Sequence, residues 1–301
     1  TRKALGWTYE PFVVPEEVRE LFAQRSAELE QEYAAWQERL RAWAAANPTL
    51  AAERECALNK VLPDDLEAQL LASVPEKPNA TRRLSGEVLQ KIAELVPSVV
   101  GGAADLAPST STIIRGAGDV APGSFGGRNL HFGVREHGMG AILNGMALYG
   151  GFIPYGATFL SFADYMRPPI RLACLMGAQV VYVYTHDSVF LGEDGPTHQP
   201  VEQIASLRLI PRMTVLRPAD GPEVAAAWAL ALRHQDGPTA LVLTRQAVPA
   251  IERDGPFDIE AFGRGGYVVA ETAGNSPDVV IVATGSEVQL AMEAKKALEG
   301  E

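Results

Sequence analysis

Apolar and polar positions follow one pattern in the first part of the chain and another in the rest. After Pro15, a residue that suits the first turn of a helix, apolar side chains recur at gaps of four, three, four and three positions. They are Leu29, Tyr33, Trp36, Leu40 and Trp43. This spacing predicts a helix whose apolar face packs against another part of the protein, and the repeat is too short to favour a coiled coil. Residues 47–80, which contain Pro63 and Pro78, are predicted to form a connection with one short helix.

From Arg82 onward, short apolar runs alternate with amphipathic segments. The runs predict strands, and they are SVVGG (98–102), NLHFG (129–133), GFIPYG (151–156), QVVYVYTHD (179–187), MTVLRP (213–218) and TALVLTR (239–245). The segments between them predict helices over 84–95, 135–148, 160–177, 200–207 and 222–234. Strands that are continuous apolar runs, separated by helices, indicate a parallel sheet. We therefore predict the α/β class, with a parallel sheet that helices cover on both faces.

The last part of the chain predicts the beginning of another domain. DVVIVATGS (278–286) is a predicted strand, and EVQLAMEAKKAL (287–298) is a predicted helix. We divide the chain into 1–62, a helical segment and linker, 63–262, the sheet domain, and 263–301, the start of a second α/β domain. Because the chain starts without Met and stops on a helix, we expect it to be an excerpt of a longer protein.

Composition excludes several classes of protein. With 47% apolar and 21% charged residues, the chain is predicted to be soluble and globular, and no apolar run approaches the roughly 18 residues that cross a bilayer. Cys56 and Cys174 lie far apart without metal-ligand spacing, which favours free thiols in a reducing cytoplasm. The net charge of −11 and the lack of a basic stripe argue against a nucleic-acid partner.

Ionisable side chains gather where the predicted strands end. The stretch LGEDGPTHQ (191–199), which follows the strand over 179–187, contains two acids and a histidine. Four of the five histidines lie between residues 131 and 198, and this shared placement favours a site over isolated structural histidines. In an open parallel sheet, ligands bind beyond the carboxyl ends of the strands. The candidates at these ends are Asp105, Ser109, Arg135, Glu136, His186, Asp187, Glu193, Asp194, His198 and Arg245.

Three kinds of site fit these residue types to different degrees. His186, Asp187 and Ser188 contain the residue types of a hydrolytic triad, but neighbours on one strand end cannot form that relay, and no GxSxG turn is present. A metal site from His186, Asp187 and His198 matches no usual ligand spacing, and neither GxGxxG nor GxxxxGKS/T follows a strand. A phosphate site is better supported, because several side chains can donate to an anion. The donors are Arg82, Ser109, His186 and Arg245.

Five stretches resemble the pyrimidine-binding domain of the transketolase family, in that family's order and spacing. They are GGAADLAPST, HFGVREHGM, PYGATFLSFADY, THDSVFLGEDGPTHQPVEQ and DGPTALVLTRQ, within about residues 82–250. LGWTYEPFVVPEEV resembles the end of the family's diphosphate-binding domain, and VVIVATGSEV resembles the start of its C-terminal domain. The GEDGPTHQP wording favours transketolase over deoxyxylulose phosphate synthases and pyruvate dehydrogenase β chains. The resemblance implies the thiamine diphosphate-binding fold, with 63–262 as the pyrimidine-binding domain.

The resemblance also implies an activity, the transfer of a two-carbon ketol unit from a ketose phosphate to an aldose phosphate in the pentose phosphate pathway. The implied cofactors are thiamine diphosphate and Mg²⁺ or Ca²⁺. In the family, a glutamate hydrogen-bonds N1′ of the pyrimidine and so favours the tautomer whose N4′ can remove the C2 proton; the carbanion that forms carries the transfer. Here that residue is Glu136. Without the motif, Glu136 would be interpreted as an acid that complements a helix dipole.

Further site residues follow from the same resemblance. Phe162 resembles the ring that stacks on the pyrimidine, Phe159 and Tyr165 line that pocket, and Asp105 lies near the cofactor. Without the motif, these aromatic residues would be interpreted as a core stripe. Asp194 and His198 match residues that contact substrate hydroxyls and the reacting carbonyl oxygen, so His198 joins Glu136 as a catalytic candidate. The implied sugar-phosphate clamp consists of Arg82, Ser109, His186 and Arg245.

The resemblance finally implies a homodimer whose active site lies between subunits, with Asp105 and Glu136 near that interface and sugar phosphates as ligands. The family's GDG…N motif, which holds the diphosphate and the metal, is missing, and the only similar Gly-Asp pair lies in GDVAPG (118–123). We therefore expect the metal ligands outside this chain. Two alternatives stay open: a formaldehyde-using transketolase of the dihydroxyacetone synthase type, and a non-catalytic pairing subunit.

Overall fold

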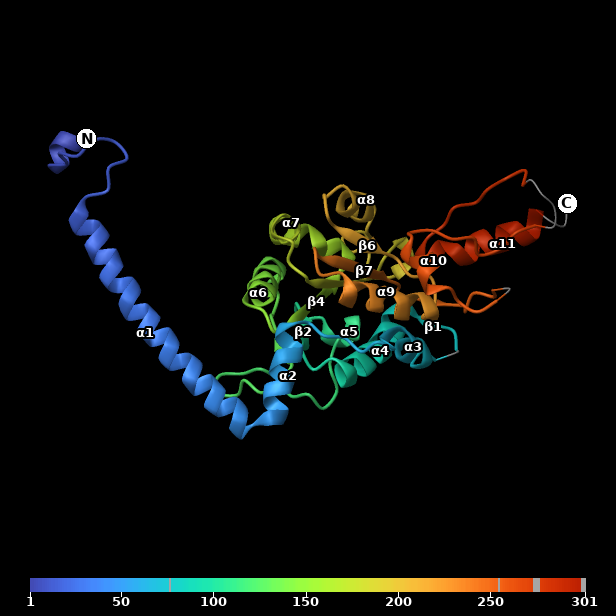
Figure 1. Ribbon diagram of the computed structural model, residues 1–301. Helices are drawn as coiled ribbons and strands as arrows, with labels where there is room; N and C mark the ends of the chain where they lie inside the picture. The colour runs from blue at the N-terminus through green and yellow to red at the C-terminus, as the bar shows by residue number, and fades with distance from the viewer. Residues whose placement is uncertain (76, 254, 273–276, 299–301) are drawn as a thin grey trace. The chain divides into compact units, whose positions relative to one another are not determined.

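The apolar runs from Arg82 onward form a sheet of six parallel strands (Figure 1). The computed structural model describes residues 1–75, 77–253, 255–272 and 277–298, in two units, Thr1–Glu55 and Cys56–Glu301. In the second unit the order of the strands is β3-β2-β4-β5-β7-β6. Their bounds are β2 Val99–Ala103, β3 Asn129–His131, β4 Ile153–Phe159, β5 Val181–Thr185, β6 Thr214–Leu216 and β7 Thr239–Leu243. The six strands predicted between 98 and 245 are therefore confirmed, with ends shifted by a few residues.

Helices cover both faces of this sheet, and each face has its own apolar core. In β5, Val181 and Val183 pack into one core, and Tyr182 and Tyr184 pack into the other, as the alternation of a strand requires. The helices over the first core are α3 (Leu66–Ala72), α4 (Thr81–Leu95) and α9 (Gly221–Arg233). Those over the second are α6 (Glu136–Tyr149), the 3-10 helix η2 (Leu160–Met166), α7 (Arg167–Met176) and α8 (Gln203–Arg208). The predicted α/β class, with helices on both faces, is confirmed (Figure 1).

The predicted helix over 160–177 consists of two elements, η2 and α7. Pro168 and Pro169 lack backbone N–H groups, so they suit the first turn of a helix and end whatever precedes them. The helix α7 therefore begins at Arg167, and Gly177, with a φ of 65°, ends it. Two short strands, β1 (Asn79–Ala80) and β8 (Ala247–Val248), pair antiparallel and were not predicted, because two residues are too few to show an alternating pattern.

The first unit contains the long helix predicted after Pro15. A 3-10 turn, η1 (Arg2–Leu5), precedes α1 (Glu16–Ala46). The apolar stripe of α1 stays exposed in the structure, with Tyr33 at 59% and Trp36 at 43%, and these two rings stack with centroids 5.7 Å apart. The helix is confirmed, while the packing of its apolar face stays a prediction.

The connection over 47–80 contains two helices, so the prediction of one short helix is wrong. The helix α2 spans Pro48–Leu58, and α3 follows at Leu66. Pro48 is accepted at a helix start, and TLAAERECAL contains no Gly or Pro that would interrupt the helix. In α3, Leu66 and Leu70 are buried in the first core, which explains why this short segment is ordered.

The predicted strand over 278–286 does not form. A strand needs a hydrogen-bonding neighbour, and none of the described segments pairs with it. Val280 and Val282 are accordingly exposed, at 74% and 89%. The segment ends in a 3-10 turn, η4 (Gly285–Glu287), and the helix predicted over 287–298 is confirmed as α11 (Val288–Leu298). A small helix, α10 (Ile259–Gly263), precedes this region.

Among the described helices, none combines the length and the apolar character that crossing a membrane requires.

Candidate functional site

The candidate site lies where the central strands of the sheet end. The pairing register aligns Phe159 of β4 with Thr185 of β5, and Thr185 with Leu243 of β7, so these strands end side by side. The residues that follow are His186 after β5 and Arg245 after β7. Side chains that are far apart in the sequence therefore lie close together at the carboxyl ends of these strands, where ligands bind in an open parallel sheet. We call this expectation the strand-end rule.

Four aromatic side chains form a stacked group at this edge, which we call the aromatic shelf: Phe159, Phe162, His186 and His198. The rings of Phe159 and His186 stack with centroids 3.6 Å apart, and those of Phe159 and Phe162 stack at 5.8 Å. His198 meets the shelf edge-on, 5.2 Å from Phe162. Phe162 is partly exposed, whereas Phe159 is only 7% exposed. Tyr165 tilts against Phe162 at 6.1 Å, but its side chain is 65% exposed.

His186 is the most constrained member of the shelf. It is 3% exposed, and its backbone has a φ of 61°, in the left-handed region that few residues other than glycine adopt. Its Nδ1 lies 2.9 Å from Oγ1 of Thr185. Burial, and then the positive charges of Arg82 and Arg245, lower the pKa of His186 to about 4, although Asp194 opposes the shift. At neutral pH the ring is therefore uncharged, and its approach to Asp194, 3.8 Å between Nε2 and Oδ2, is not an ion pair.

Acid is expected to destabilise the fold through His186. Its pKa of about 4 in the folded protein lies below the ordinary value of about 6.5, so the unfolded chain takes up this proton first. The stabilising contribution is complete above about pH 6.5 and is lost as the pH falls toward about 4. Asparagine suits a left-handed backbone. We therefore expect His186→Asn to reduce the fall in the free energy of unfolding as the pH decreases through this range. The measurement is the free energy of urea unfolding of both proteins across this pH range.

Buried carboxylates act in the opposite sense, and the comparison must separate them from His186. Burial raises the pKa of Asp187 and of Glu223, so their protonation favours the folded state as the pH falls. These contributions are present in the parent and in the variant, and they cancel in the difference between the two curves. Parallel curves for the parent and for His186→Asn would contradict a buried, neutral imidazole.

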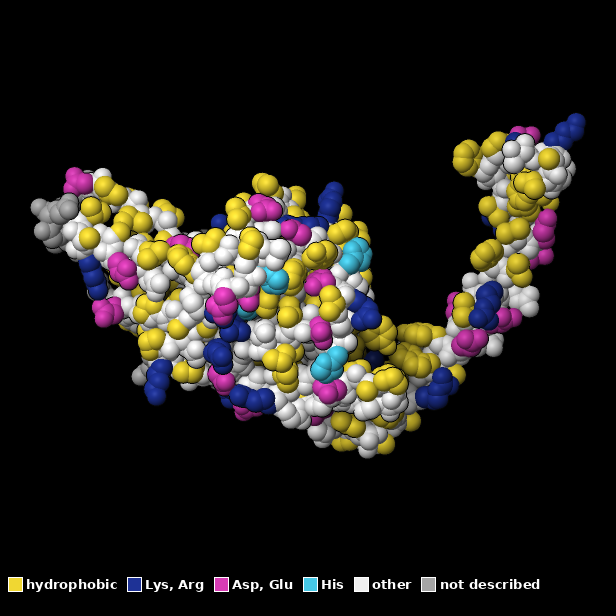
Figure 2. Space-filling model, turned by 180° about the vertical axis from the view of Figure 1, so that it is seen from behind, with side chains coloured by type: hydrophobic (Ala, Val, Ile, Leu, Met, Phe, Trp, Pro, Cys, Tyr) yellow, Lys and Arg dark blue, Asp and Glu magenta, His cyan; other side chains and the backbone are white. Residues whose placement is uncertain are grey.

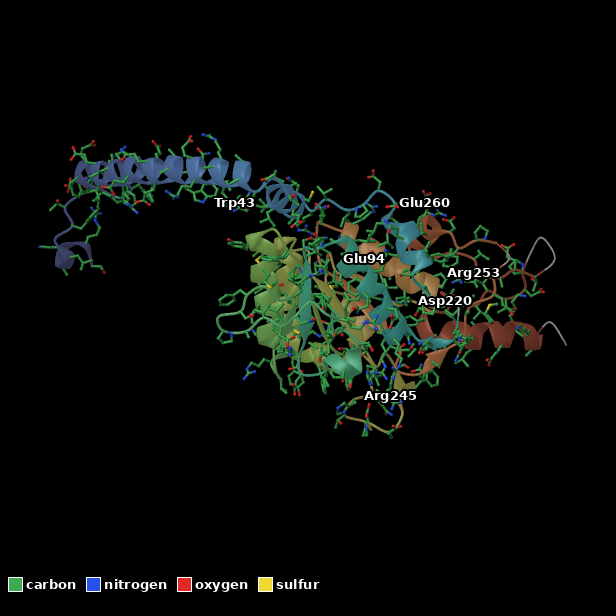
Figure 3. The ribbon with its side chains drawn as sticks, turned by 90° about the horizontal axis from the view of Figure 1, so that it is seen from below. Trp43, Glu94, Asp220, Arg245, Arg253 and Glu260 are labelled. Atoms are coloured by element: carbon green, nitrogen blue, oxygen red, sulfur yellow. The ribbon has the colours of Figure 1, made fainter. Side chains whose placement is uncertain are left out.

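Two arginines supply positive charge beside the shelf. The guanidinium of Arg82, at the start of α4, donates through Nη1 to the backbone carbonyl of Ser109. Its Nε is buried without a partner among the described residues, and burial together with Arg83 and Arg245 lowers its pKa. Arg245 lies at the edge of the unit in Figure 3, and its Nη2 pairs with Oε1 of Glu193 at 2.9 Å. This edge therefore holds two cations and an unmet donor, which suits an anion.

The loop after β5 carries acidic and imidazole groups to the same place. Asp194, at 35% side-chain exposure, faces His186, and Oγ1 of Thr197 lies 2.9 Å from Nδ1 of His198. Figure 2 shows histidine side chains at the surface of the larger unit with acidic and basic side chains near them. The predicted residues Arg82, His186, Asp194, His198 and Arg245 interact electrostatically in one group.

Glu136 and Asp105 follow neighbouring strands but stand apart from this group. Glu136 begins α6 and is 9% exposed, and no side chain in the described part of the chain is hydrogen-bonded to its carboxylate. Asp105 follows β2 with a φ of 61° and is exposed. Ser109 lies in the short helix α5 (Ala107–Thr110), where its carbonyl receives Arg82. Among the residues that the structure describes, no hydrogen bond, ion pair or ring contact joins Glu136, Asp105 or Ser109 to the aromatic shelf.

Asp187 has a different role from the one its sequence position suggests. Its carboxylate turns away from His186 and receives Nε and Nη2 of Arg217 at 3.0 and 2.6 Å. Within the ranges that the structure describes, no three His, Cys, Asp or Glu side chains form a group that could hold a metal ion. Arg217 was missed in the sequence because it was counted within the predicted strand over 213–218, whereas in the structure it directly follows β6 (Thr214–Leu216).

Comparison with protein families gives three adjoining matches. Residues 77–250 match the family described as "Transketolase, pyrimidine binding domain". Residues 1–63 match "Transketolase, thiamine diphosphate binding domain", and residues 265–301 match "Transketolase-like TK C-terminal domain".

Curated relatives are longer than this chain. The transketolase of Geobacillus stearothermophilus is 50% identical over 303 residues, which is 100% of this chain and 45% of the relative. That of Aquifex aeolicus is 49% identical over 99% of this chain and 43% of its own length. The chain therefore spans a little less than half the length of these relatives.

Solved structures show the same fold. A mutant transketolase of Pichia stipitis in complex with xylulose 5-phosphate matches with a TM-score of 0.92 at 40% identity, over 99% of this chain and 45% of that one. A structure described as "Split gene transketolase, inactive beta4 tetramer" matches with a TM-score of 0.58 at 29% identity, over 74% of this chain and 68% of that one.

Proposed function

Since this chain belongs to the transketolase family, we propose that it supplies the pyrimidine-binding and substrate-binding half of a thiamine diphosphate-dependent transketolase. The proposed reaction moves a two-carbon ketol unit from a ketose phosphate to an aldose phosphate. One observation carries this proposal: the aromatic shelf, Arg82, Arg245 and the loop with Asp194 adjoin at one edge of the sheet. An apolar surface, a cationic clamp and hydroxyl-binding groups together suit a phosphorylated sugar.

The phosphate end of the sugar is proposed to bind Arg82, Ser109, His186 and Arg245. The two arginines carry the charge, and the unmet Nε of Arg82 is available to a phosphate oxygen. Because burial keeps His186 uncharged at neutral pH, it contributes a hydrogen bond and no charge. Structures of Pichia stipitis transketolase with sedoheptulose 7-phosphate, and of a mutant of it with fructose 6-phosphate, support ligands of this class.

The pyrimidine of the cofactor is proposed to bind between Glu136 and the aromatic shelf. Glu136 is 9% exposed and its carboxylate is hydrogen-bonded to no side chain in the described part of the chain, so it is available to a donor on a ligand, such as a protonated pyrimidine N1′. Phe162 has ring surface left for stacking, and Phe159 supports it from behind. These residues therefore fit the pyrimidine, with Tyr165 and Asp105 as further proposed contacts. Bound thiamine diphosphate supplies a carbon nucleophile that also accepts the electron pair of the broken C–C bond.

The chain's own residues then have separate tasks. Glu136 holds a proton at N1′, and the buried surroundings of this carboxylate strengthen that hydrogen bond. Asp194 orients substrate hydroxyls, and His198, edge-on to the shelf, is proposed to hold or move a proton at the reacting carbonyl oxygen. The diphosphate and Mg²⁺ or Ca²⁺ are proposed to bind ligands outside this chain.

We propose a homodimer of the whole protein, with Asp105 and Glu136 near the subunit interface, and a cytoplasmic location. The division into 1–62, 63–262 and 263–301 is retained as a proposal. A non-catalytic pairing subunit is the second candidate, because a relative in fold is described as an inactive tetramer of a split-gene transketolase. A formaldehyde-using transketolase is the third candidate. Measuring activity with phosphorylated and unphosphorylated acceptors distinguishes it from a transketolase that uses aldose phosphates.

The test of the proposed function is a titration in two stages. Thiamine diphosphate is added first to the chain alone and then to the chain mixed with a transketolase diphosphate-binding domain, and ketol transfer to an aldose phosphate is measured. We expect weak binding to the chain alone, and tight binding with activity in the mixture. Tight binding without any transfer would favour the pairing subunit.

Asp194→Ala is expected to reduce discrimination between sugar epimers. A polar group aimed at a substrate hydroxyl penalises an analogue that lacks it, because a buried partner is then left unpaired. The loop that carries Asp194 turns at Gly195, with a φ of 84°, and Oδ2 of Asp194 lies 3.8 Å from Nε2 of His186. We expect kcat/KM to fall most for the correctly configured ketose and least for its epimer, with thiamine diphosphate affinity nearly unchanged. An equal fall for both epimers would reassign Asp194 to loop structure.

A further inference from the structure

The backbone just after His186 is anchored by a buried ion pair. The side chain of Asp187 is 1% exposed, and that of Arg217 is 8% exposed. Nε and Nη2 of Arg217 both donate to Oδ2 of Asp187, and Ser188 donates to Oδ1 at 3.3 Å. Asp187 is thus bound on both oxygens, one residue from a proposed substrate ligand and at the base of the loop that carries Asp194 and His198.

Arg217 is held in turn by a segment from the far end of the chain. We call this segment the latch turn, residues 284–287. The carbonyl of Thr284 accepts from Nη1 of Arg217 at 3.1 Å, Oγ of Ser286 from Nη2 at 3.0 Å, and the carboxylate of Glu287 accepts from both nitrogens. Ser286 also donates to Oδ2 of Asp187 at 3.1 Å. The latch turn therefore touches both partners of the ion pair.

Gly285 is the residue that allows the latch turn to close. Its φ is 58°, and a Cβ at this position would lie 2.6 Å from Cγ of Arg217. Any larger residue would be strained in the backbone and would also displace the Arg217 side chain. The Thr-Gly-Ser-Glu sequence is thus fitted to the guanidinium it surrounds.

The left-handed backbone of His186 explains what the anchor does. Residues other than glycine keep such a conformation only where their surroundings hold them in it. At His186 the turn directs the imidazole onto Phe159, 3.6 Å between centroids, while the next side chain points to Arg217. With Asp187 fixed in one direction and Phe159 packed in the other, the backbone between them has little freedom to relax.

We propose that Arg217 and the latch turn are positioning elements of the substrate site, which hold Asp187 so that His186 stays stacked on Phe159. The consequence for sugar phosphate binding rests on the proposed function; the position of His186 does not. In this way the last part of the chain contributes to a site that it does not itself line.

The competing interpretation is that the ion pair only attaches the last segment to the sheet, and the chain offers a matched control for it. Arg253, with 12% side-chain exposure, pairs with Asp220 at 2.6 Å and with Glu223 at 3.4 Å. It also contacts the hydroxyl of Tyr267 at 3.1 Å. In Figure 3 Asp220 and Arg253 lie together, away from Arg245. Arg253 is thus a buried arginine of the same kind that is not joined to the base of the His186 loop.

The experiment compares Arg217→Lys with Arg253→Lys in the full chain by NMR of the His186 ring. In the parent we expect stacking on Phe159 to shift the ring protons upfield, and burial lowers the pKa of His186 to about 4. We expect Arg217→Lys to move these resonances toward those of free histidine and to raise that pKa, because lysine keeps the charge but loses the two-pronged contact. Arg253→Lys should lower the thermal midpoint to a similar extent and leave the His186 resonances in place. Unchanged His186 resonances in both variants, or equal movement in both, would overturn the proposal.

A milder variant guards against a failure of Arg217→Lys to fold. Ser286→Ala removes one hydrogen-bond donor to Asp187. Ser286 is 1% exposed, and the smaller alanine side chain fits in its place. The resonances of His186 should move in the same direction by a smaller amount, and no movement counts against the proposal. In the assembled enzyme, Ser286→Ala should raise KM for phosphorylated sugars several-fold with kcat retained. If the parent assembly has no ketol-transfer activity, the proposed function fails, while the NMR result still decides the positioning role.

Discussion

Glu136→Gln is expected to abolish most ketol transfer while the fold stays intact. Proton transfer by a positioned side chain contributes roughly 10²–10⁴-fold to rate, so we expect kcat to fall by at least about 100-fold. The amide has nearly the same shape as the carboxylate but cannot hold the N1′ proton. The loss should appear in kcat more than in KM for sugars, because the affected step is activation of the cofactor.

The same substitution should not reduce stability, and this separates a functional from a structural role. Glu136 is 9% exposed, and its carboxylate is hydrogen-bonded to no side chain in the described parts of the chain. The substitution therefore breaks no side-chain hydrogen bond of the described residues, and the amide fills nearly the same space as the carboxylate. Glu94→Gln, at a side chain that is 68% exposed beside Lys91, is the control. A rate near that of the parent, or a marked fall in the thermal midpoint, would contradict the assignment.

The sheet could be predicted from the sequence because its strands carry their own signal. Each of the runs in β2, β4, β5 and β7 is buried throughout, and a strand buried on both faces must be apolar at nearly every position. The helices between them were predicted for the same reason, since each covers one face of the sheet. Local pattern and tertiary burial agree in this part of the chain.

The predictions failed where a segment depends on a partner that the pattern does not reveal. The run over 278–286 is as apolar as β5, but no described strand lies beside it, so it forms no ladder. The helix α1 formed as predicted, and the surface that its stripe contacts could not be predicted from the stripe. Periodicity shows which residues prefer burial and does not show what buries them.

The arrangement of the candidate site residues was predicted in part, for a related reason. The strand-end rule brought His186, Asp194 and Arg245 to one edge, because parallel strands end together. It could not show that the side chain of Asp187 turns away from His186. The direction of this side chain depends on Arg217 and also on residues 284–287, which lie about a hundred positions after Asp187 in the chain. Ion pairs between distant segments leave no local pattern in a sequence.

Arg245→Ala is expected to raise KM for phosphorylated sugars by about 10- to 150-fold, the equivalent of a charge-assisted hydrogen bond of about 1.5–3 kcal/mol. Unphosphorylated acceptors of the same configuration should be almost unaffected, because they bring no charge to the clamp. The measurement is kcat and KM for a matched pair of acceptors, with and without the phosphate, in the chain assembled with a diphosphate-binding domain.

The pairing of Arg245 with Glu193 explains why this loss should not be structural. Glu193 is 80% exposed, and an exposed ion pair contributes only about 0–1 kcal/mol, so removing it should leave the thermal midpoint nearly unchanged. Arg115→Ala is the matched control, since Arg115 is 66% exposed and pairs with Glu87 at 2.7 Å. Under the proposed function, Arg245 exchanges the carboxylate of Glu193 for a more highly charged phosphate, and the gain in affinity is expected to come from that exchange. If both acceptors lost affinity equally, Arg245 would not belong to the phosphate clamp, and its contact with Glu193 would serve only to hold the loop in place.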